Sequence, residues 1–321
     1  MFTAFLILTV CFVAFTNGAN ANFKGVASLY GSGTTSLRQA LYWGTAMTFA
    51  GSIAAAFLGH GLLKTFSGRG IVPDSLVQSP SFVSAVALGA ALTSFLATRF
   101  GFPVSTTHAL TGALAGAGFA GSGSEVHLEA LGKLFLYPLF FSPVVAVILG
   151  GLIYLILRAI RLAPDHRTPT LDALHFLSAG AASFARGLND TPKMVALLLV
   201  APGIDVRWGF VAVAVMIALG GLLDADKVAE TLGKKVTAMN PGQGFAASLS
   251  TACLVTTASF HSLPVSTTHV SVGSLLGIGI TTRQAHWRKV GEILLAWITT
   301  VPCGALLAAI SYWVVGLLGK S

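Results

Sequence analysis

Two identical runs of small hydroxyl residues lie far apart in this sequence of 321 residues. Pro-Val-Ser-Thr-Thr-His spans residues 103–108 and recurs at residues 264–269, which is 161 positions later. A proline followed by Ser or Thr is typical of a helix start, where free backbone N–H groups favour an oxyanion. The simpler alternative is that these hydroxyls only cap helices. Because the run is duplicated, we expect a tetrahedral anion to be bound by hydroxyls of both copies: Ser105, Thr106, Thr107, Ser266, Thr267 and Thr268.

A second, looser repeat places ionisable side chains inside apolar sequence. Residues 18–24 (Gly-Ala-Asn-Ala-Asn-Phe-Lys) are similar to residues 187–193 (Gly-Leu-Asn-Asp-Thr-Pro-Lys), 169 positions later. Asp190 is a carboxylate well inside an apolar stretch, and such a residue is a functional hypothesis by default. Arg186 and Lys193 would share its helix face, because they lie four and three positions away. The alternative is a buried ion pair that only holds helices together.

The second repeat also predicts an interrupted helix. Gly187 and Pro192 flank Asn189 and Asp190, and both residue types weaken a helix. A break at this point would free backbone carbonyl groups to bind a cation. We therefore expect Asn189 and Asp190 to take part in such a site.

The composition defines the class of protein that must position these residues. Apolar residues make up 54% of the chain and charged residues 9%, whereas ordinary soluble domains have about 25% charged residues. This excludes a cytosolic enzyme, a disordered protein and a DNA-binding domain. The chain is expected to be a polytopic membrane protein, because its apolar stretches reach the roughly 20 residues that a membrane helix needs. These stretches are residues 2–30, 39–63, 82–121, 131–158, 172–202, 207–223, 243–281 and 289–317.

The hydroxyl runs interrupt two of these stretches near their middle, which predicts re-entrant hairpins at about residues 82–121 and 243–281. A hairpin makes no net crossing, so each half would cross the membrane an odd number of times and the halves would be inverted. Hairpin arms that cross fully would instead make the halves parallel. We expect an all-α fold of two inverted repeats, residues 1–160 and 171–321, each with a broken helix, joined by a cytoplasmic linker at 161–170.

The basic residues between the apolar stretches indicate the orientation in a plasma (inner) membrane. An outside N-terminus places ten of them in the cytoplasm: Arg38, Arg158, Arg161, Arg167, Lys227, Lys234, Lys235, Arg283, Arg288 and Lys289. Five would lie outside: Lys64, Arg69, Lys133, Arg207 and Lys320. This excess favours the outside N-terminus.

The chain resembles the inorganic phosphate transporter family, the PiT-type permeases. The resemblance covers nearly the whole chain and implies a homodimeric symporter in which the hairpin Ser and Thr residues bind the anion. It also implies that Asn-Asp pairs bind sodium or mediate proton coupling, so a Na+ ion is expected at Asn20, Asn189 and Asp190. The matching residues are Gly-Ala-Asn at 18–20, Leu-Arg-Gln-Ala at 37–40, both hydroxyl runs, Gly-Leu-Asn-Asp at 187–190, and Trp-Arg-Lys at 287–289 leading to Leu-Ala-Trp at 295–297.

The sequence departs from the family pattern at two positions. The family has an Asp after Gly-Ala-Asn, where this chain has Ala21. Ala21 is either an engineered replacement or the mark of a divergent subgroup with altered coupling. Many family members have an Asn where this chain has Lys24, so both halves now carry a lysine that can stand where a bound cation would. If Lys24, Arg186, Asp190 and Lys193 share one cavity, their charges sum to +2, which matches a divalent anion.

The expected function is import of inorganic phosphate in symport with Na+ or H+ across the lipid bilayer. A sulfate or related oxyanion permease of the same fold is the alternative, and an anion channel is a weaker one because closed hairpins do not form a continuous pore. We expect neither an enzyme nor a nucleic-acid partner, since the sequence shows no nucleophile paired with a base. No cofactor is expected apart from Na+ as a coupling ion.

Overall fold

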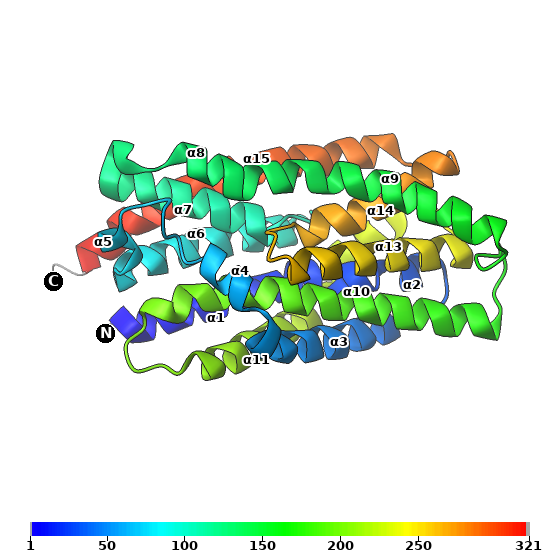
Figure 1. Ribbon diagram of the computed structural model, residues 1–321, viewed down its shortest axis with the longest axis horizontal. Coiled ribbons are helices and arrows are strands. Elements are labelled where there is room, and N and C mark those ends of the chain that lie inside the picture. The colour runs from blue at the N-terminus through cyan, green and yellow to red at the C-terminus, as the bar shows by residue number, and fades with distance from the viewer. Residues whose placement is uncertain (1, 319–321) are drawn as a thin grey trace.

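The structure is a computed structural model that describes residues 2–318, so Lys320 lies outside the described residues. Over that range the chain is a bundle of helices (Figure 1). Five short segments have 3-10 or π geometry: Asn22–Gly25, Gly123–Glu125, Gly132–Leu136, Ala196–Val200 and Thr231–Lys235. The α-helices are α1 (Phe2–Ala21), α2 (Ala27–Gly31), α3 (Leu37–Leu58), α4 (His60–Thr65), α5 (Asp74–Val77), α6 (Pro80–Arg99), α7 (Thr106–Ser122), α8 (Leu128–Leu131), α9 (Tyr137–Ala159), α10 (Pro169–Val195), α11 (Val206–Asp224), α12 (Asp226–Glu230), α13 (Pro241–Phe260), α14 (Thr267–Thr281) and α15 (Trp287–Leu318).

Six helical segments of the described chain are long and apolar enough to cross a membrane. Helix α10 is not one of them, because charged side chains lower its hydropathy. The expected fold class, an all-α polytopic membrane protein, is confirmed. The six segments are Thr3–Gly25, Leu37–Leu58, Pro80–Arg99, Leu128–Ala159, Val206–Asp224 and Trp287–Leu317.

Both hydroxyl runs lie where the chain turns back on itself. Helices α6 and α7 form one hairpin and α13 and α14 form the other, and the two hairpins occupy opposite halves of the bundle with their turns near its middle (Figure 1). Ser105 and Ser266 are the N-cap residues of α7 and α14, and their extended backbones have nearly the same dihedral angles. The expected helix starts within residues 82–121 and 243–281 are therefore present.

The packing of the helices is unchanged when the two halves are exchanged. Helix α1 packs against α6 and α11, and its counterpart α10 packs against α13 and α3. In the same way α7 packs against α15, the last long helix of the other half, and α14 packs against α9. The two halves are thus interlocked.

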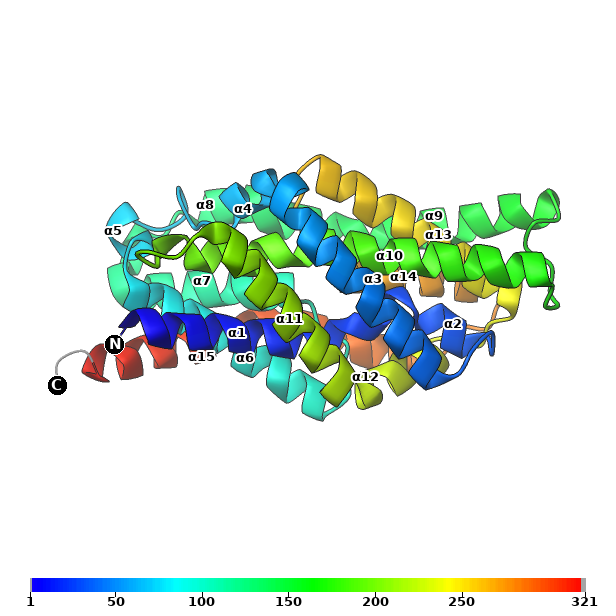
Figure 2. The same ribbon diagram turned by 90° about the horizontal axis from the view of Figure 1, so that it is seen from below.

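The counterpart helices run in opposite directions along the bundle. The chain begins at one end and α1 leads away from it, whereas α10 starts at the other end and leads back (Figures 1 and 2). This is the arrangement that an inverted repeat requires.

Small residues let equivalent helices approach closely. A side chain at Gly18 of α1 would collide with the main chain at Ile217 of α11, and one at Gly187 of α10 would collide with the main chain at Thr48 of α3. Gly18 and Gly187 are 169 positions apart, as in the repeat. Such small residues are the usual means of close helix packing in membranes.

The prediction of a helix break between Gly187 and Pro192 is wrong. Helix α10 is continuous to Val195 and changes to 3-10 geometry only afterwards, at Ala196–Val200. Proline removes one N–H donor, but a membrane helix tolerates this loss when neighbouring helices support it. In the first half the change comes earlier, since α1 gives way to a 3-10 segment at Asn22–Gly25.

Candidate functional site

The tips of the two hairpins contact each other at the centre of the bundle. The Thr107 hydroxyl donates to the Val265 carbonyl at 3.3 Å, and the Thr268 hydroxyl donates to the Val104 carbonyl at 2.8 Å. These two contacts are equivalent under the repeat. Each hairpin tip is therefore completed by a threonine of the other half.

The two hydroxyl-run serines have a local role. Ser105 accepts a hydrogen bond from the backbone N–H of His108 at 3.2 Å, and Ser266 accepts one from that of His269 at 3.1 Å. These are helix caps, the role that sequence reasoning held as the alternative to anion binding. The threonines, in contrast, face the interior of the site.

Each hairpin tip also binds a buried lysine. Lys24 donates to the Val104 carbonyl at 2.8 Å, to the Thr268 hydroxyl at 2.5 Å and to the Asn20 side-chain oxygen at 3.3 Å. All of these partners are oxygen atoms, which are also the ligands of a hard cation such as Na+. The Lys24 ammonium thus occupies a cation position within the protein.

Lys193 has the equivalent set of partners in the other half. It donates to the Val265 carbonyl at 2.9 Å, to the Thr107 hydroxyl at 2.8 Å and to the Asp190 carboxylate at 3.0 Å. The first two partners are the repeat counterparts of those of Lys24. The third differs, because a carboxylate pairs with Lys193 whereas an amide oxygen contacts Lys24.

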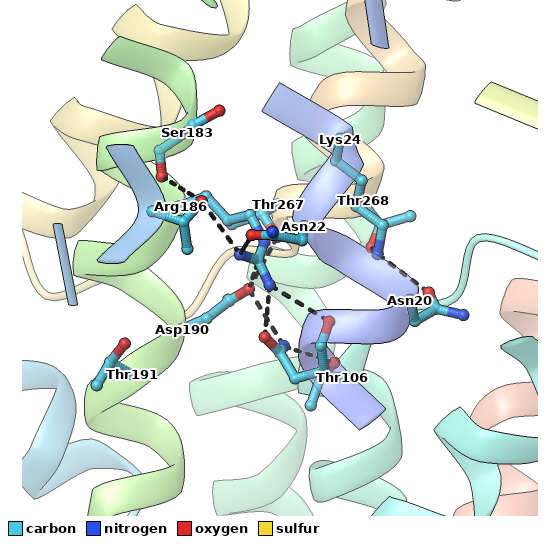
Figure 3. A network of polar contacts seen from close by, with 12 residues as sticks. Asn20, Asn22, Lys24, Thr106, Ser183, Arg186, Asp190, Thr191, Thr267 and Thr268 are labelled. Atoms are coloured by element: carbon cyan, nitrogen blue, oxygen red, sulfur yellow. Dashed lines mark hydrogen bonds and ion pairs between the residues drawn. The ribbon is translucent and has the colours of Figure 1, made fainter. Parts of the chain in front are cut away.

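Asp190 pairs with Lys193. Figure 3 shows it among Arg186 and Thr267 of the same network. Its second oxygen accepts from the Thr267 hydroxyl at 3.2 Å and from the Asn17 amide at 3.4 Å, and lies 3.7 Å from Nε of Arg186. Buried carboxylates persist when they are paired and hydrogen-bonded in this way. Arg186 and Lys193 thus share a face of α10 with Asp190, as expected, and form the buried ion pairs that were the alternative to a functional role.

Arg186 is fully buried and extends toward α1. Its guanidinium donates to the side-chain oxygen of Asn17 at 2.5 Å, to that of Asn22 at 3.2 Å and to the Thr48 hydroxyl at 3.4 Å. Asn17 also donates to Thr106 at 2.9 Å. Arg186 thus joins α10, α1 and α3 around the hairpin tips.

The four ionisable groups of the network contain three cationic residues and one acidic residue. Lys24, Arg186 and Lys193 are 4%, 1% and 1% exposed, and Asp190, the single carboxylate among the four expected charges, is 3% exposed. Taking all four as ionised gives +2. An uncompensated charge in a low-dielectric interior is costly, and either an added anion or loss of a proton from a lysine would relieve it.

The three residues expected to bind Na+ have different partners. Asn20 donates to Thr98 at 3.0 Å and to the Phe102 carbonyl at 2.9 Å, which anchors the α6–α7 hairpin. Asn189 donates to Ser259 at 2.9 Å and so anchors the α13–α14 hairpin. The Asn189 side-chain oxygen is buried and has no hydrogen-bond partner in the described chain, whereas the oxygens of Asn20 and Asp190 have partners. Within residues 2–318, there is no group of three or more His, Cys, Asp or Glu side chains that could hold a metal ion.

Ala21 lies at the position where the repeat would place a second carboxylate. It is buried and precedes Lys24 by three residues, as Asp190 precedes Lys193. Its methyl group gives Lys24 no counter-charge, so Lys24 depends on oxygen dipoles alone. With a carboxylate at this position, the excess charge of the four groups would be +1 instead of +2.

Sequence reasoning missed several polar residues of the network. Asn17 is the repeat counterpart of Arg186, and Thr98 is the counterpart of Ser259, so a systematic search at 169 and 161 positions would have found them. Asn22 and Thr48 carry no such signal, because their partner Arg186 is distant in sequence and becomes adjacent only in the fold.

The fold and the site define an integral membrane transporter with a positively charged central site, and comparison with known proteins gives its family. The sequence model of the phosphate transporter family matches residues 17–171 and 163–308. A Rhizobium meliloti protein named "Probable low-affinity inorganic phosphate transporter" is 31% identical, and the match covers 98% of this chain and 96% of the relative. A Bacillus subtilis protein of the same name is 27% identical, with 98% and 97% covered.

The chain belongs to the phosphate transporter family, as the resemblance implied, and is a transporter rather than an enzyme. Its fold is similar to that of a solved structure described as the sodium-dependent phosphate transporter, with a TM-score of 0.84 and 23% identity. That similarity covers 98% of this chain and 99% of the other. At this identity it bears on the fold alone.

Proposed function

We propose that this chain is a secondary transporter that imports inorganic phosphate together with a cation, Na+ or H+. The anion is held between the two hairpin tips by Thr106, Thr107, Thr267 and Thr268 at the N-termini of α7 and α14. The observation that carries this proposal is the buried network with an excess charge of +2 at those tips. A divalent oxyanion would neutralise it.

Hydrogen phosphate suits this site better than sulfate does. Phosphate brings a proton that it can donate to a carboxylate, whereas sulfate brings none. Asp190 is the acceptor of the network, and it already accepts hydrogen bonds from Lys193 and Thr267. The family assignment favours the same choice.

The coupling ion has two candidate places. Asn189 offers an unpartnered side-chain oxygen, and Pro192 leaves the Leu188 carbonyl without its helical donor, so both oxygens could bind Na+. Lys24 and Lys193 fill the equivalent places at the hairpin tips with fixed positive charge. Fewer places are thus left for mobile cations, which favours H+.

We place the chain in the plasma membrane with its N-terminus outside. The α9–α10 and α14–α15 connections lie at the end of the bundle opposite the N-terminus (Figure 1). They contain or adjoin Arg158, Arg161, Arg167, Arg283 and Arg288, as the positive-inside rule requires of a cytoplasmic face. The domain boundaries at 160 and 171 and the homodimer implied by the family are part of the same proposal.

The test is uptake of labelled phosphate by the purified chain in liposomes, with sulfate as competitor, under an imposed Na+ gradient, an imposed H+ gradient or neither. Saturable uptake is expected, and the gradient that drives it identifies the coupling ion. Lys193→Met should abolish this uptake. Lys64→Met removes an exposed lysine outside the network and is the matched control.

Three outcomes would contradict the proposal. Preferential transport of sulfate would make the chain a sulfate permease. Flux that does not saturate would indicate a channel. Equal uptake by the wild type and Lys193→Met would remove the hairpin network from the transport site.

A further inference from the structure

A chain of hydrogen-bonded side chains leads from the protein surface into the interior at one end of the bundle. The hydroxyl of half-buried Ser32 contacts that of Thr34 at 2.8 Å, and Thr34 contacts Nδ1 of His175 at 3.3 Å. Nε2 of His175 contacts the Ser28 hydroxyl at 2.9 Å, and Ser28 contacts the Ser248 hydroxyl at 2.5 Å. All members after Ser32 are buried.

The inner end of this chain reaches the central network. A small cavity of about 10 Å³ lies between α2, α13 and α14, and a single buried water needs about that volume. Polar residues line much of it: Lys24, Ser28, Ser248, Thr251 and Ser271. The hydrogen-bonded series of hydroxyls and imidazole therefore ends at a cavity lined by Lys24, whose backbone carbonyl accepts a hydrogen bond from Ser271 at 2.8 Å.

Every member of this chain can both donate and accept a proton. A hydroxyl has one donor and two lone pairs, and a neutral imidazole has one nitrogen of each kind. His175 has a hydroxyl partner at each ring nitrogen, so a proton accepted at one nitrogen can leave from the other. Each transfer breaks one O–H or N–H bond and forms another, so the side chains are regenerated.

These hydrogen bonds are not needed for helix packing, because the helices of the other half pack in the same way without them. At the repeat spacings, the counterparts of Ser32, Thr34, His175, Ser28 and Ser248 are Ala201, Gly203, Leu6, Leu197 and Ala87. Four of these, all except the glycine, belong to one buried hydrophobic cluster. The hydrogen-bonded series therefore exists at one end of the molecule, and mainly buried apolar side chains occupy the equivalent place at the other.

We propose that Ser32, Thr34, His175, Ser28 and Ser248 form a proton pathway between the surface near the α2–α3 turn and the cavity beside Lys24. This rests on the proposed function, because it supplies the route for a coupling proton that accompanies phosphate.

Two charged groups act on the ends of the pathway. Asp172 lies one turn before His175 on α10 and is paired with Arg167 at 2.7 Å, and this pairing raises the pKa of Arg167. Lys24 lies at the inner end. The imidazole thus lies between the Asp172 carboxylate at the outer end and the cavity lined by Lys24 at the inner end.

The test compares two fluxes in liposomes that contain a pH-sensitive dye. Exchange of labelled for unlabelled phosphate without a pH gradient measures passage of the substrate, and the dye measures proton movement during net phosphate influx. His175→Leu introduces the counterpart residue, and Ser28→Ala is a smaller change that protects the test against misfolding. Ser178→Ala is the matched control. The buried Ser178 hydroxyl donates to the backbone carbonyl of His175 within α10 and is not part of the pathway.

We expect both pathway variants to keep phosphate exchange within about twofold and to slow proton movement by about tenfold or more. The control should keep both fluxes. Unchanged proton movement in both variants would overturn the pathway, and so would net uptake by the wild type that follows Na+ without protons, although the proposed function would then stand. Absence of phosphate exchange in the wild type would overturn the proposed function and the pathway together.

Discussion

At the scale of single residues, the two lysines of the network have matching oxygen partners but different counter-charges. Lys193 pairs with Asp190 at 3.0 Å, whereas Lys24 has the methyl group of Ala21 three positions before it. This difference accounts for one of the two excess positive charges, and Arg186 accounts for the other. We therefore expect Ala21 to set the affinity for a divalent anion.

Ala21→Asp should weaken phosphate binding. The new carboxylate would pair with Lys24 and reduce the net charge of the network from +2 to +1, so we expect the Kd to rise about tenfold, or about 1.4 kcal/mol. Isothermal titration calorimetry in detergent measures this. Ala21→Asn has a similar size without the charge and is the control. Tighter binding by the Asp variant would show that a carboxylate belongs in this site.

Asp190→Asn should destabilise the protein, because Lys193 and Arg186 would lose their buried counter-charge. Breaking a buried pair typically costs about 3–5 kcal/mol, so a marked fall of the thermal unfolding temperature is expected. The double variant Asp190→Asn, Lys193→Met removes the orphaned ammonium and should recover part of that loss without recovering uptake. If Asp190→Asn alone were as stable as the wild type, the ion pairs of Asp190 would not contribute to stability.

The duplicated runs allowed the threonines at the hairpin tips to be predicted from sequence. Their binding of lysine could not be predicted, because Thr107 and Lys193 are 86 positions apart and Thr268 and Lys24 are 244 apart. The conformation of the backbone at each hairpin turn decides which hydroxyls cap a helix and which face the site, and the sequence does not show that conformation. The sequence therefore indicated the right residues without their partners.

At the scale of elements, the helix crossings depend on paired glycines. Gly18 and Gly220 lie at the crossing of α1 and α11, and Gly51 and Gly187 lie at that of α3 and α10. In each case the space for a side chain is filled by main-chain atoms of the facing helix, which cannot move aside. These crossings hold Asn17 and Arg186 in contact.

Gly187→Val should destabilise the protein by about 1–3 kcal/mol, the usual cost of overpacking a rigid contact. The unfolding temperature in detergent measures the effect, and phosphate affinity should fall with it because α10 carries Arg186, Asp190 and Lys193. Gly291→Ala on α15 has open space around the added atom and should be neutral. Equal stability of the two variants would contradict the close crossing.

Element boundaries were predictable where the cue was strong. Proline and serine marked the hairpin turns, which the structure places at residues 100–105 and 261–266. The prediction of a break at Pro192 was wrong, since α10 stays continuous there with the proline ring packed beside Gly59 of the α3–α4 connection. A local cue cannot reveal that kind of tertiary support.

At the scale of the whole molecule, each long helix packs against the same neighbours as its counterpart in the other half. The similarity of the halves was visible in the sequence, and the odd number of crossings predicted their opposite directions. The interlocking was not visible, because α7 packs against α15 and α14 against α9 across the two halves. Neither half buries its hairpin by itself.

The orientation can be tested with single cysteines after the three native ones, Cys11, Cys253 and Cys303, are replaced. Arg161→Cys on the exposed α9–α10 connection should react with a membrane-impermeant maleimide only in inside-out vesicles. Arg69→Cys on the exposed α4–α5 connection should react only in intact cells. The reverse pattern would place the N-terminus in the cytoplasm.

The central claim is that excess positive charge at the two hairpin tips binds phosphate. The most direct measurement is the phosphate Kd of the wild type, Lys24→Met and Lys193→Met by titration calorimetry in detergent. Each variant lowers the net charge by one at equivalent places in opposite halves, so we predict that both bind phosphate about tenfold more weakly or worse. Wild-type affinity in both variants would contradict the claim.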